Sequence, residues 1–179
     1  PCCCNLFAIA HMVGGMHVPD GFLDAPTSVA TGIVAAAGIA VALKGARREL
    51  DDRTAPMAGL VATFVFAAQM INFPVGAGTS GHLMGGALAA VLVGPWSAVL
   101  CLSVVLLVQA LLMADGGITA LGTNITLIGL VTVAVGWTSF VVLRRLLPPR
   151  TSSVPIAAAI GAFLSVPVAA VVFTLLFAV

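Results

Sequence analysis

The chain has 179 residues, of which 61% are hydrophobic and only 7% charged, and its mean hydropathy is +1.21. In soluble domains about a quarter of the residues are charged, so this composition indicates an integral membrane protein. The formal net charge of +1 gives no basic surface of the kind that nucleic acid requires, which argues against a nucleic-acid-binding protein.

The first fifteen residues do not resemble the apolar sequence that follows them. Three of the four cysteines lie there and the fourth is Cys101, a spacing that matches neither a zinc site nor a disulfide framework. The stretch has an apolar centre but no basic flank, so it is a poor signal peptide. We expect residues 1–15 to be a doubtful leader or upstream read-through before a start at Met16, with Met12 as the alternative. Residues 16–179 are then one transmembrane domain.

Six apolar segments predict an all-α integral membrane protein, a bundle of about six transmembrane helices. A membrane-spanning helix needs about 20 mainly apolar residues, and the third segment is shorter than that. We expect it to form a tight hairpin with the fourth, turning at residues 94–96 (GPW). The last segment ends without a polar flank, so we expect one more helix beyond it. The segments are residues 28–43, 55–73, 82–93, 97–114, 124–143 and 154–179.

The basic residues predict which loops face the cytoplasm. If the segments alternate and residues 16–27 lie outside, every Lys and Arg is cytoplasmic, as the positive-inside rule requires. The other outer segments are then 74–81 and 115–123, and all three are rich in Gly, Pro, Asp and Thr. The polar residues of the chain therefore converge on the outer face. The cytoplasmic basic residues are Lys44, Arg47, Arg48, Arg53, Arg144, Arg145 and Arg150.

Two histidines belong to these outer segments, His17 and His82. Ionisable groups at such a depth are costly, so each is a candidate functional residue. The alternatives are a solvated His17 on a terminus anchored by Phe22 and Leu23, and a His82 at a capped helix start that bonds to a loop. Two imidazoles without a cysteine pair or a carboxylate cage indicate Ni(II), Co(II), Cu(II) or Zn(II).

A start at Met16 would create a chelating terminus. The free amine of Met16, the amide nitrogen of His17 and the His17 imidazole can close two fused chelate rings in one plane. His82 could fill the fourth corner, and square-planar nitrogen coordination suits Ni(II) and Cu(II). The turn-forming residues 19–21 (PDG) would fold this terminus inward.

Further polar residues lie near the same face. Asp115 could hold a ligand imidazole or be a simple turn residue. Thr123 and Asn124 start a predicted helix and could cap it. Gln69 and Asn72, near the outer end of the second segment, predict an interhelical hydrogen bond.

Three other classes of membrane protein are alternatives to a metal-capture protein. An ATP-independent channel or secondary transporter would need ionisable residues along its spans, which are almost free of them. A zinc enzyme built on His17, His82 and Asp115 would need an open ligand position and a general base, and Glu49 in a cytoplasmic loop is the only glutamate. A structural protein would leave the polar outer segments unexplained. The chain has no nucleotide-binding loop, so any use of ATP falls to a partner.

The sequence resembles the CbiM/NikM family, the substrate-capture (S) components of energy-coupling factor transporters for cobalt and nickel. The resemblance rests on MHVPDGFL at 16–23, NFPVGAGTSGHLMGG at 72–86, GPW at 94–96 and DGGITALGTNI at 115–125. It implies a helical bundle with its N-terminal segment inserted into the outer face. It also implies a transported Ni²⁺ or Co²⁺ held by Met16, His17 and His82, with no permanently bound cofactor and no enzymatic activity.

The resemblance also implies partners and a location. The partners are a transmembrane coupling (T) protein, two ABC-type ATPases and, in some systems, a small accessory membrane protein. The location is the inner (plasma) membrane of a prokaryote, with multiple spans and the metal site outside. Family members begin at the Met-His pair, and a retained extension would turn the Met16 amine into an amide and remove one ligand. Members also continue past this C-terminus, usually through another helix.

Overall fold

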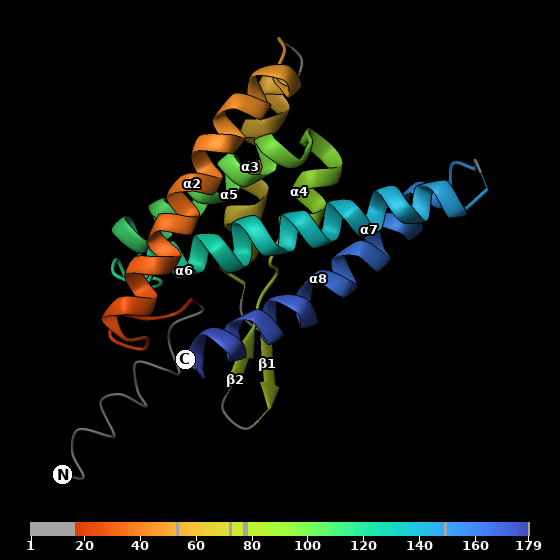
Figure 1. The fold of residues 1–179 in the computed structure, drawn as a ribbon. Helices are drawn as coiled ribbons and strands as arrows, with labels where there is room; N and C mark the ends of the chain where they lie inside the picture. Colours follow the sequence, from red (N-terminus) through yellow and green to blue (C-terminus); the bar gives the residue numbers. More distant parts are fainter. Residues whose placement is uncertain (1–16, 53, 72, 77–78, 149, 179) are drawn as a thin grey trace, which may run out of the picture.

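The apolar segments form a bundle of helices, as the composition predicts (Figure 1). Four helical segments of the described chain are long and apolar enough to cross a membrane. They are α2 (Ala25–Glu49), α5 (Pro95–Leu112), the continuous segment Leu121–Leu146 and α8 (Ser153–Phe177). The all-α, multi-pass membrane fold is therefore confirmed. This computed structural model describes residues 17–52, 54–71, 73–76, 79–148 and 150–178.

Two shorter helices complete the bundle. Helix α3 (Thr54–Gln69) has 16 residues, and α4 (Gly86–Val93) has 8, which amounts to about 12 Å of helix. Gly94, with φ of 89°, forms the predicted hairpin turn between α4 and α5. The prediction that His82 opens a helix is wrong, because residues 82–85 have no regular secondary structure and α4 begins only after Gly85, whose φ is 77°.

The segment between α3 and α4 contains two short strands that the sequence did not predict. Strands β1 (Phe73–Gly76) and β2 (Thr79–Gly81) pair antiparallel, with Phe73 opposite Gly81 and an irregularity between Pro74 and Gly76. The predicted helix 55–73 ends early, at Gln69. Proline disfavours a helical conformation in the residue before it, so Pro74 helps to end the helix.

The predicted helix 124–143 is longer and less regular than expected. It comprises α6 (Leu121–Asn124), the π-helical turn η1 (Ile125–Val131) and α7 (Thr132–Leu146). The hydroxyl groups of Thr31 and Thr123 lie 2.8 Å apart, and the Thr126 hydroxyl donates to the Thr31 carbonyl at 3.2 Å. These bonds tie the start of the helix to α2. π-Helical turns frequently occur at functional sites, and this one directly follows Asn124.

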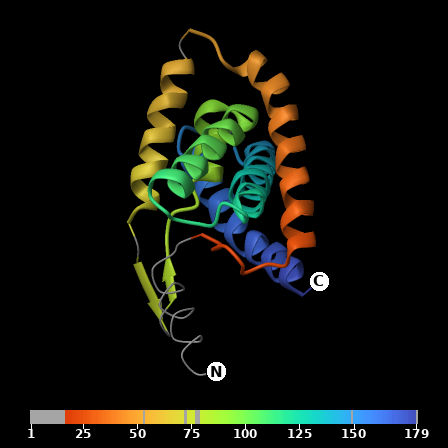
Figure 2. The ribbon, with the colours of Figure 1, turned by 90° about the vertical axis from the view of Figure 1, so that its left-hand side faces the viewer.

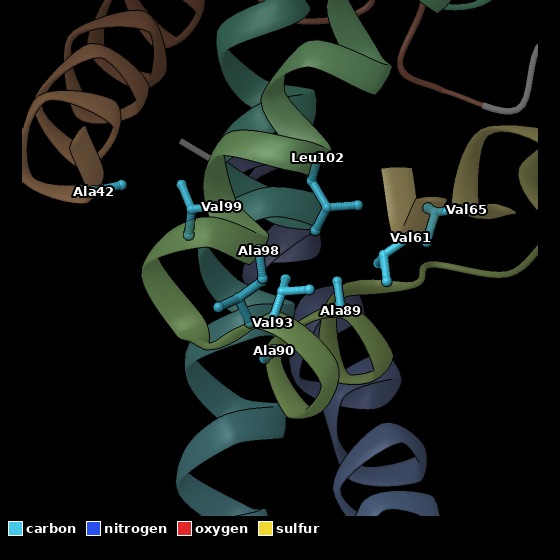
Figure 3. Close-up of a cluster of buried hydrophobic side chains, with 10 residues drawn as sticks. Ala42, Val61, Val65, Ala89, Ala90, Val93, Ala98, Val99 and Leu102 are labelled. Atoms are coloured by element: carbon cyan, nitrogen blue, oxygen red, sulfur yellow. The ribbon is translucent and has the colours of Figure 1, made fainter. Parts of the chain in front are cut away.

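Helix α5 lies inside the bundle, between α2 on one side and α3 on the other (Figure 2). Its buried residues meet side chains from α2, α3, α4 and α7 in a core of small and branched residues, most of which Figure 3 shows. The short side chains let the helix backbones approach closely, which supplies packing energy in lipid. The core residues are Ala42, Val61, Val65, Ala89, Ala90, Val93, Ala98, Val99, Leu102 and Val133.

We predict that Gly122→Ala destabilises the protein. A Cβ atom on Gly122 would lie 2.6 Å from the Gly32 nitrogen, so α2 and α6 must separate. Overpacking of this kind costs about 1–3 kcal/mol. Gly59→Ala is the matched control, because a Cβ on Gly59 meets nothing within 4 Å. Thermal unfolding of both variants in detergent measures the difference, and equal melting temperatures would contradict the close approach of α2 and α6.

Candidate functional site

The segment that precedes α2 is held against the rest of the protein by the side chain of Asn124. Asn124 Oδ1 accepts a hydrogen bond of 3.0 Å from the Val18 amide, and Asn124 Nδ2 donates one of 3.2 Å to the Val18 carbonyl. The Gly117 amide donates to the same carbonyl at 2.9 Å. One side chain thus satisfies both backbone groups of Val18, in the way that a neighbouring strand would. The helix cap considered for Asn124 is not what its side chain forms.

Asp20 fastens the same segment to the loop before α6. Its carboxylate accepts hydrogen bonds from both the amide (2.7 Å) and the hydroxyl (2.5 Å) of Thr119. These bonds favour the ionised form and lower the pKa of Asp20 below its usual value. The contact therefore persists at neutral pH and is lost only when the pH falls through that lowered pKa.

Phe22 anchors the other end of this segment against α8. Its ring stacks on Phe173, with centroids 5.9 Å apart, and on Phe177, with centroids 5.4 Å apart. Aromatic pairs at such distances contribute about 0.5–1.5 kcal/mol beyond the burial of their area. Residues 17–22 are thus held by hydrogen bonds on one side and by aromatic stacking on the other, and we call them the docked segment.

This docking buries His17 at the end of the bundle. The residue is only 5% exposed, and Nδ1 lies 3.2 Å from Asp115 Oδ2. Neither ring nitrogen makes a hydrogen bond within the described part of the chain. A buried polar atom without a hydrogen bond costs about 1–3 kcal/mol, so this imidazole requires an explanation.

The loop that carries Asp115 has an unusual backbone. Ala114 has φ of 52° and Gly116 has φ of 94°, so the chain turns sharply on both sides of the aspartate. A Cβ atom on Gly116 would lie 2.8 Å from His17 Cβ and 3.1 Å from Asn124 Nδ2. Only glycine fits both this conformation and this space. A positive φ at a non-glycine residue such as Ala114 is uncommon and concentrates at functional sites.

His82 meets His17 from the segment between β2 and α4. The two imidazole centroids are 5.1 Å apart, and the rings are tilted by 57°. His82 Nδ1 lies 3.0 Å from the Leu83 carbonyl oxygen, which can only accept a hydrogen bond. The neutral imidazole therefore carries its proton on Nδ1, and the lone pair is on Nε2.

A cavity of about 310 Å³ adjoins the two histidines. Met84 lines it beside His82, and Phe22 and Phe173 line it from the docked segment and α8. Among the described residues, no group of three or more His, Cys, Asp and Glu side chains is placed to hold a metal ion. Any metal bound here would need further ligands besides these side chains.

Two buried glutamines are hydrogen-bonded to each other and to the backbone of the segment that contains His82. Gln69 and Gln109 are fully buried, and Gln109 Nε2 donates to Gln69 Oε1 at 3.0 Å. Gln69 Nε2 in turn donates to the Met84 carbonyl at 3.0 Å. The predicted interhelical hydrogen bond of Gln69 is confirmed, and it positions the backbone two residues after His82. Asn72 lies outside the described residues.

The structure thus brings together most of the residues that the sequence singled out. His17, His82, Asp115 and Asn124 meet at one end of the bundle, whereas Met16 lies outside the described residues. The sequence analysis missed Thr119 and the stacking of Phe173 and Phe177 on Phe22. Phenylalanines within an apolar run give no signal of a long-range partner. The fold and this site define a multi-pass helical membrane protein in which a buried histidine lies beside a half-buried one at one end.

Comparison with known proteins identifies the family. The family described as cobalt uptake substrate-specific transmembrane region, CbiM, matches residues 17–179, and the chain belongs to it. The cobalt transport protein CbiM of Sorangium cellulosum is 40% identical over 133 residues, 73% of this chain and 59% of that protein. The fused nickel transport protein NikMN of Rhodobacter capsulatus is 43% identical over 109 residues, 61% of this chain and 31% of that protein.

A solved structure shares the fold. The crystal structure of a truncated transition metal transporter superposes with a TM-score of 0.74 at 31% sequence identity, covering 84% of this chain and 70% of the other. The chain spans about half the length of the curated relatives that it matches.

We predict that Asn124→Ala releases the docked segment, because the amide and carbonyl of Val18 lose their shared partner. Amide hydrogen exchange at residues 18–22 should accelerate about tenfold, as expected for the loss of roughly 1–2 kcal/mol of hydrogen bonding. Thr138→Ala is the control, since that exposed hydroxyl bonds only within its own helix. Unchanged exchange in Asn124→Ala would show that the aromatic stacking alone holds the segment.

Proposed function

We propose that this chain is the substrate-specific membrane component of a cobalt or nickel importer and captures the divalent ion at His17 and His82. The supporting observation is the buried imidazole of His17, whose ring nitrogens make no hydrogen bond in the described chain. It lies within 5.1 Å, between ring centroids, of a second imidazole whose Nε2 carries a lone pair. Imidazole nitrogens are ligands that Ni(II) and Co(II) accept readily. Membership of a cobalt uptake family supports the same function.

The remaining ligands in this proposal come from the backbone. The Met16 amine and the His17 amide nitrogen would complete a square of nitrogens with the two imidazoles, a geometry that Ni(II) favours. This arrangement requires a free amine on Met16. It also agrees with the finding that no three described His, Cys, Asp and Glu side chains gather into a metal cluster.

The chelate sets a condition on the His17 ring. A six-membered ring that includes the metal and the His17 amide nitrogen can close only through Nδ1, which lies 3.2 Å from Asp115 Oδ2. We propose that the ring makes a half-turn about the Cβ–Cγ bond when the ion binds. The half-turn moves Nδ1 away from Asp115 and places Nε2–H on the edge that faces the carboxylate. Asp115 would then orient the ligand and raise its basicity.

We further propose that the site faces the outside of a prokaryotic plasma membrane and that ATP-driven partners complete the transporter. The basic groups of the described helices lie in the last two turns of α2 and the last turn of α7, and the positive-inside rule assigns such ends to the cytoplasm. The proposed partners are a transmembrane coupling protein, two ABC-type ATPases and a small accessory membrane protein. The fused nickel transport protein of Rhodobacter capsulatus supports the idea of an additional component.

An ATP-independent channel or secondary transporter is the alternative function. Such proteins use ionisable residues in the middle of their spans. In the four long described spans, Lys and Arg occur only toward the ends of α2 and α7. Metal uptake that requires both a co-purifying ATPase and ATP would support the importer, whereas uptake by the chain alone would support the channel.

We predict that His82→Ala abolishes high-affinity binding of nickel or cobalt without unfolding the protein. Loss of one nitrogen ligand should weaken binding by more than the roughly 10–100-fold that loss of an outer-shell partner costs. Titration calorimetry should use protein whose N-terminal sequence and intact mass show a free Met16 amine. Leu83→Ala, a change in the exposed neighbour, is the control. An unchanged titration for His82→Ala would disprove the proposed site.

We predict a smaller effect for Asp115→Asn. The amide keeps the shape of the side chain but loses the charge beside His17 Nδ1, so it should orient the imidazole less well. Loss of a partner behind a metal ligand costs about 10–100-fold in affinity. A cellular metal-uptake assay compares this variant with His82→Ala. Equal losses in the two variants would mean that Asp115 is itself a ligand.

A further inference from the structure

A second cavity lies beside the C-terminal end of α2, far from the histidines. It measures about 340 Å³ and is lined by α2 and by Trp96 at the start of α5. Helix α2 has 25 residues, so this end is about 37 Å from the docked segment that precedes the helix. The lining residues are Val41, Lys44, Gly45, Arg48, Glu49 and Trp96.

Glu49, the acidic residue of this cavity, is bonded to the first turn of α5. Its carboxylate accepts hydrogen bonds from the Ser97 amide (2.8 Å), the Ser97 hydroxyl (3.0 Å) and the Trp96 amide (3.3 Å). The N-terminus of a helix carries a partial positive charge, which stabilises this carboxylate. The negative charge is therefore used to join α2 to α5.

The two cations of the cavity are not balanced in the same way. Lys44 and Arg48 lie one turn apart on the same face of α2, and both are exposed. Neither forms an ion pair within the described part of the chain. Their two positive charges therefore face the cavity opening beside a carboxylate that is already bonded to helix amides.

Trp96 forms one wall of the cavity and indicates where the cavity lies relative to the bilayer. Trp96 is 42% exposed and packs closely against α2, since a Cβ atom on Gly45 would lie 2.6 Å from its ring. Tryptophan, lysine and arginine concentrate where the bilayer core meets the headgroups. Val41, one turn further into the membrane, is 53% exposed and offers an apolar surface. The cavity thus has basic side chains where a lipid headgroup would lie and an apolar wall where an acyl chain would lie.

We propose that this cavity binds the phosphate of an anionic phospholipid, between Lys44 and Arg48, with an acyl chain lying along Val41 and the Trp96 ring. Basic pockets between membrane helices recognise anionic headgroups, and the apolar wall distinguishes a lipid from a free anion. The bound lipid would stabilise the contact between α2 and α5. This site goes beyond the proposed metal capture, because none of its residues contacts the docked segment.

The test measures lipid binding to the full chain purified in a mild detergent. Phosphatidylglycerol and phosphatidylcholine with identical acyl chains are titrated, and bound lipid is counted by native mass spectrometry. We expect phosphatidylglycerol to bind more tightly than phosphatidylcholine. Lys44→Gln/Arg48→Gln should weaken that binding about 25-fold, or about fivefold for each cation near an anionic surface.

Arg144→Gln/Arg145→Gln is the matched control, because it removes the same charge from the last turn of α7. It should leave phosphatidylglycerol binding unchanged. Lys44→Gln alone provides a second variant with half of the charge removed and should show the intermediate loss. Equal binding of both lipids, or equal losses in the two double variants, would overturn the proposal. Displacement of phosphatidylglycerol by an equal concentration of inorganic phosphate would also overturn it, since the site would then bind a free anion.

Discussion

The two hydrogen bonds between Asn124 and the backbone of Val18 are the constraint on which the site depends. They give a segment without regular secondary structure the partners that a strand would have. Phe22 adds apolar contact with α8 on the other side. Once these contacts form, His17 has no position other than the buried one beside Asp115. The metal proposal therefore rests on the way the segment is held.

The burial of the His17 imidazole costs free energy, and the neighbouring residues hold the imidazole in place. Its Nε2 lies out of water without a hydrogen bond in the described chain, a state that proteins avoid unless a ligand or a chemical role compensates, whereas Nδ1 lies 3.2 Å from the Asp115 carboxylate. The positive φ values at Ala114 and Gly116 bring Asp115 to the ring, and the Gln69 and Gln109 pair fixes the backbone that follows His82. The positive φ of Ala114 and the buried His17 imidazole thus occur at the same end of the bundle.

The two ends of α2 differ in the charge of the groups around them. The histidine end holds the buried His17 imidazole, and at the Lys44 end two exposed basic side chains line the second cavity. Between them the spans carry almost no charge, because an ionised group in the bilayer core is expensive. At the Lys44 end, the carboxylate of Glu49 joins α2 to the first turn of α5.

The sequence by itself determined the membrane class, the helical bundle, the GPW turn and the family, because apolar length, turn residues and short motifs are local properties. It also singled out His17, His82, Asp115 and Asn124, since polar residues in an apolar chain are conspicuous. Only the tertiary structure decided what each side chain contacts, for example that Asn124 binds Val18 and that Thr119 binds Asp20. These contacts join residues about a hundred positions apart, and the hydrogen-bonding partner of an amide or a hydroxyl depends on packing between helices rather than on neighbouring sequence.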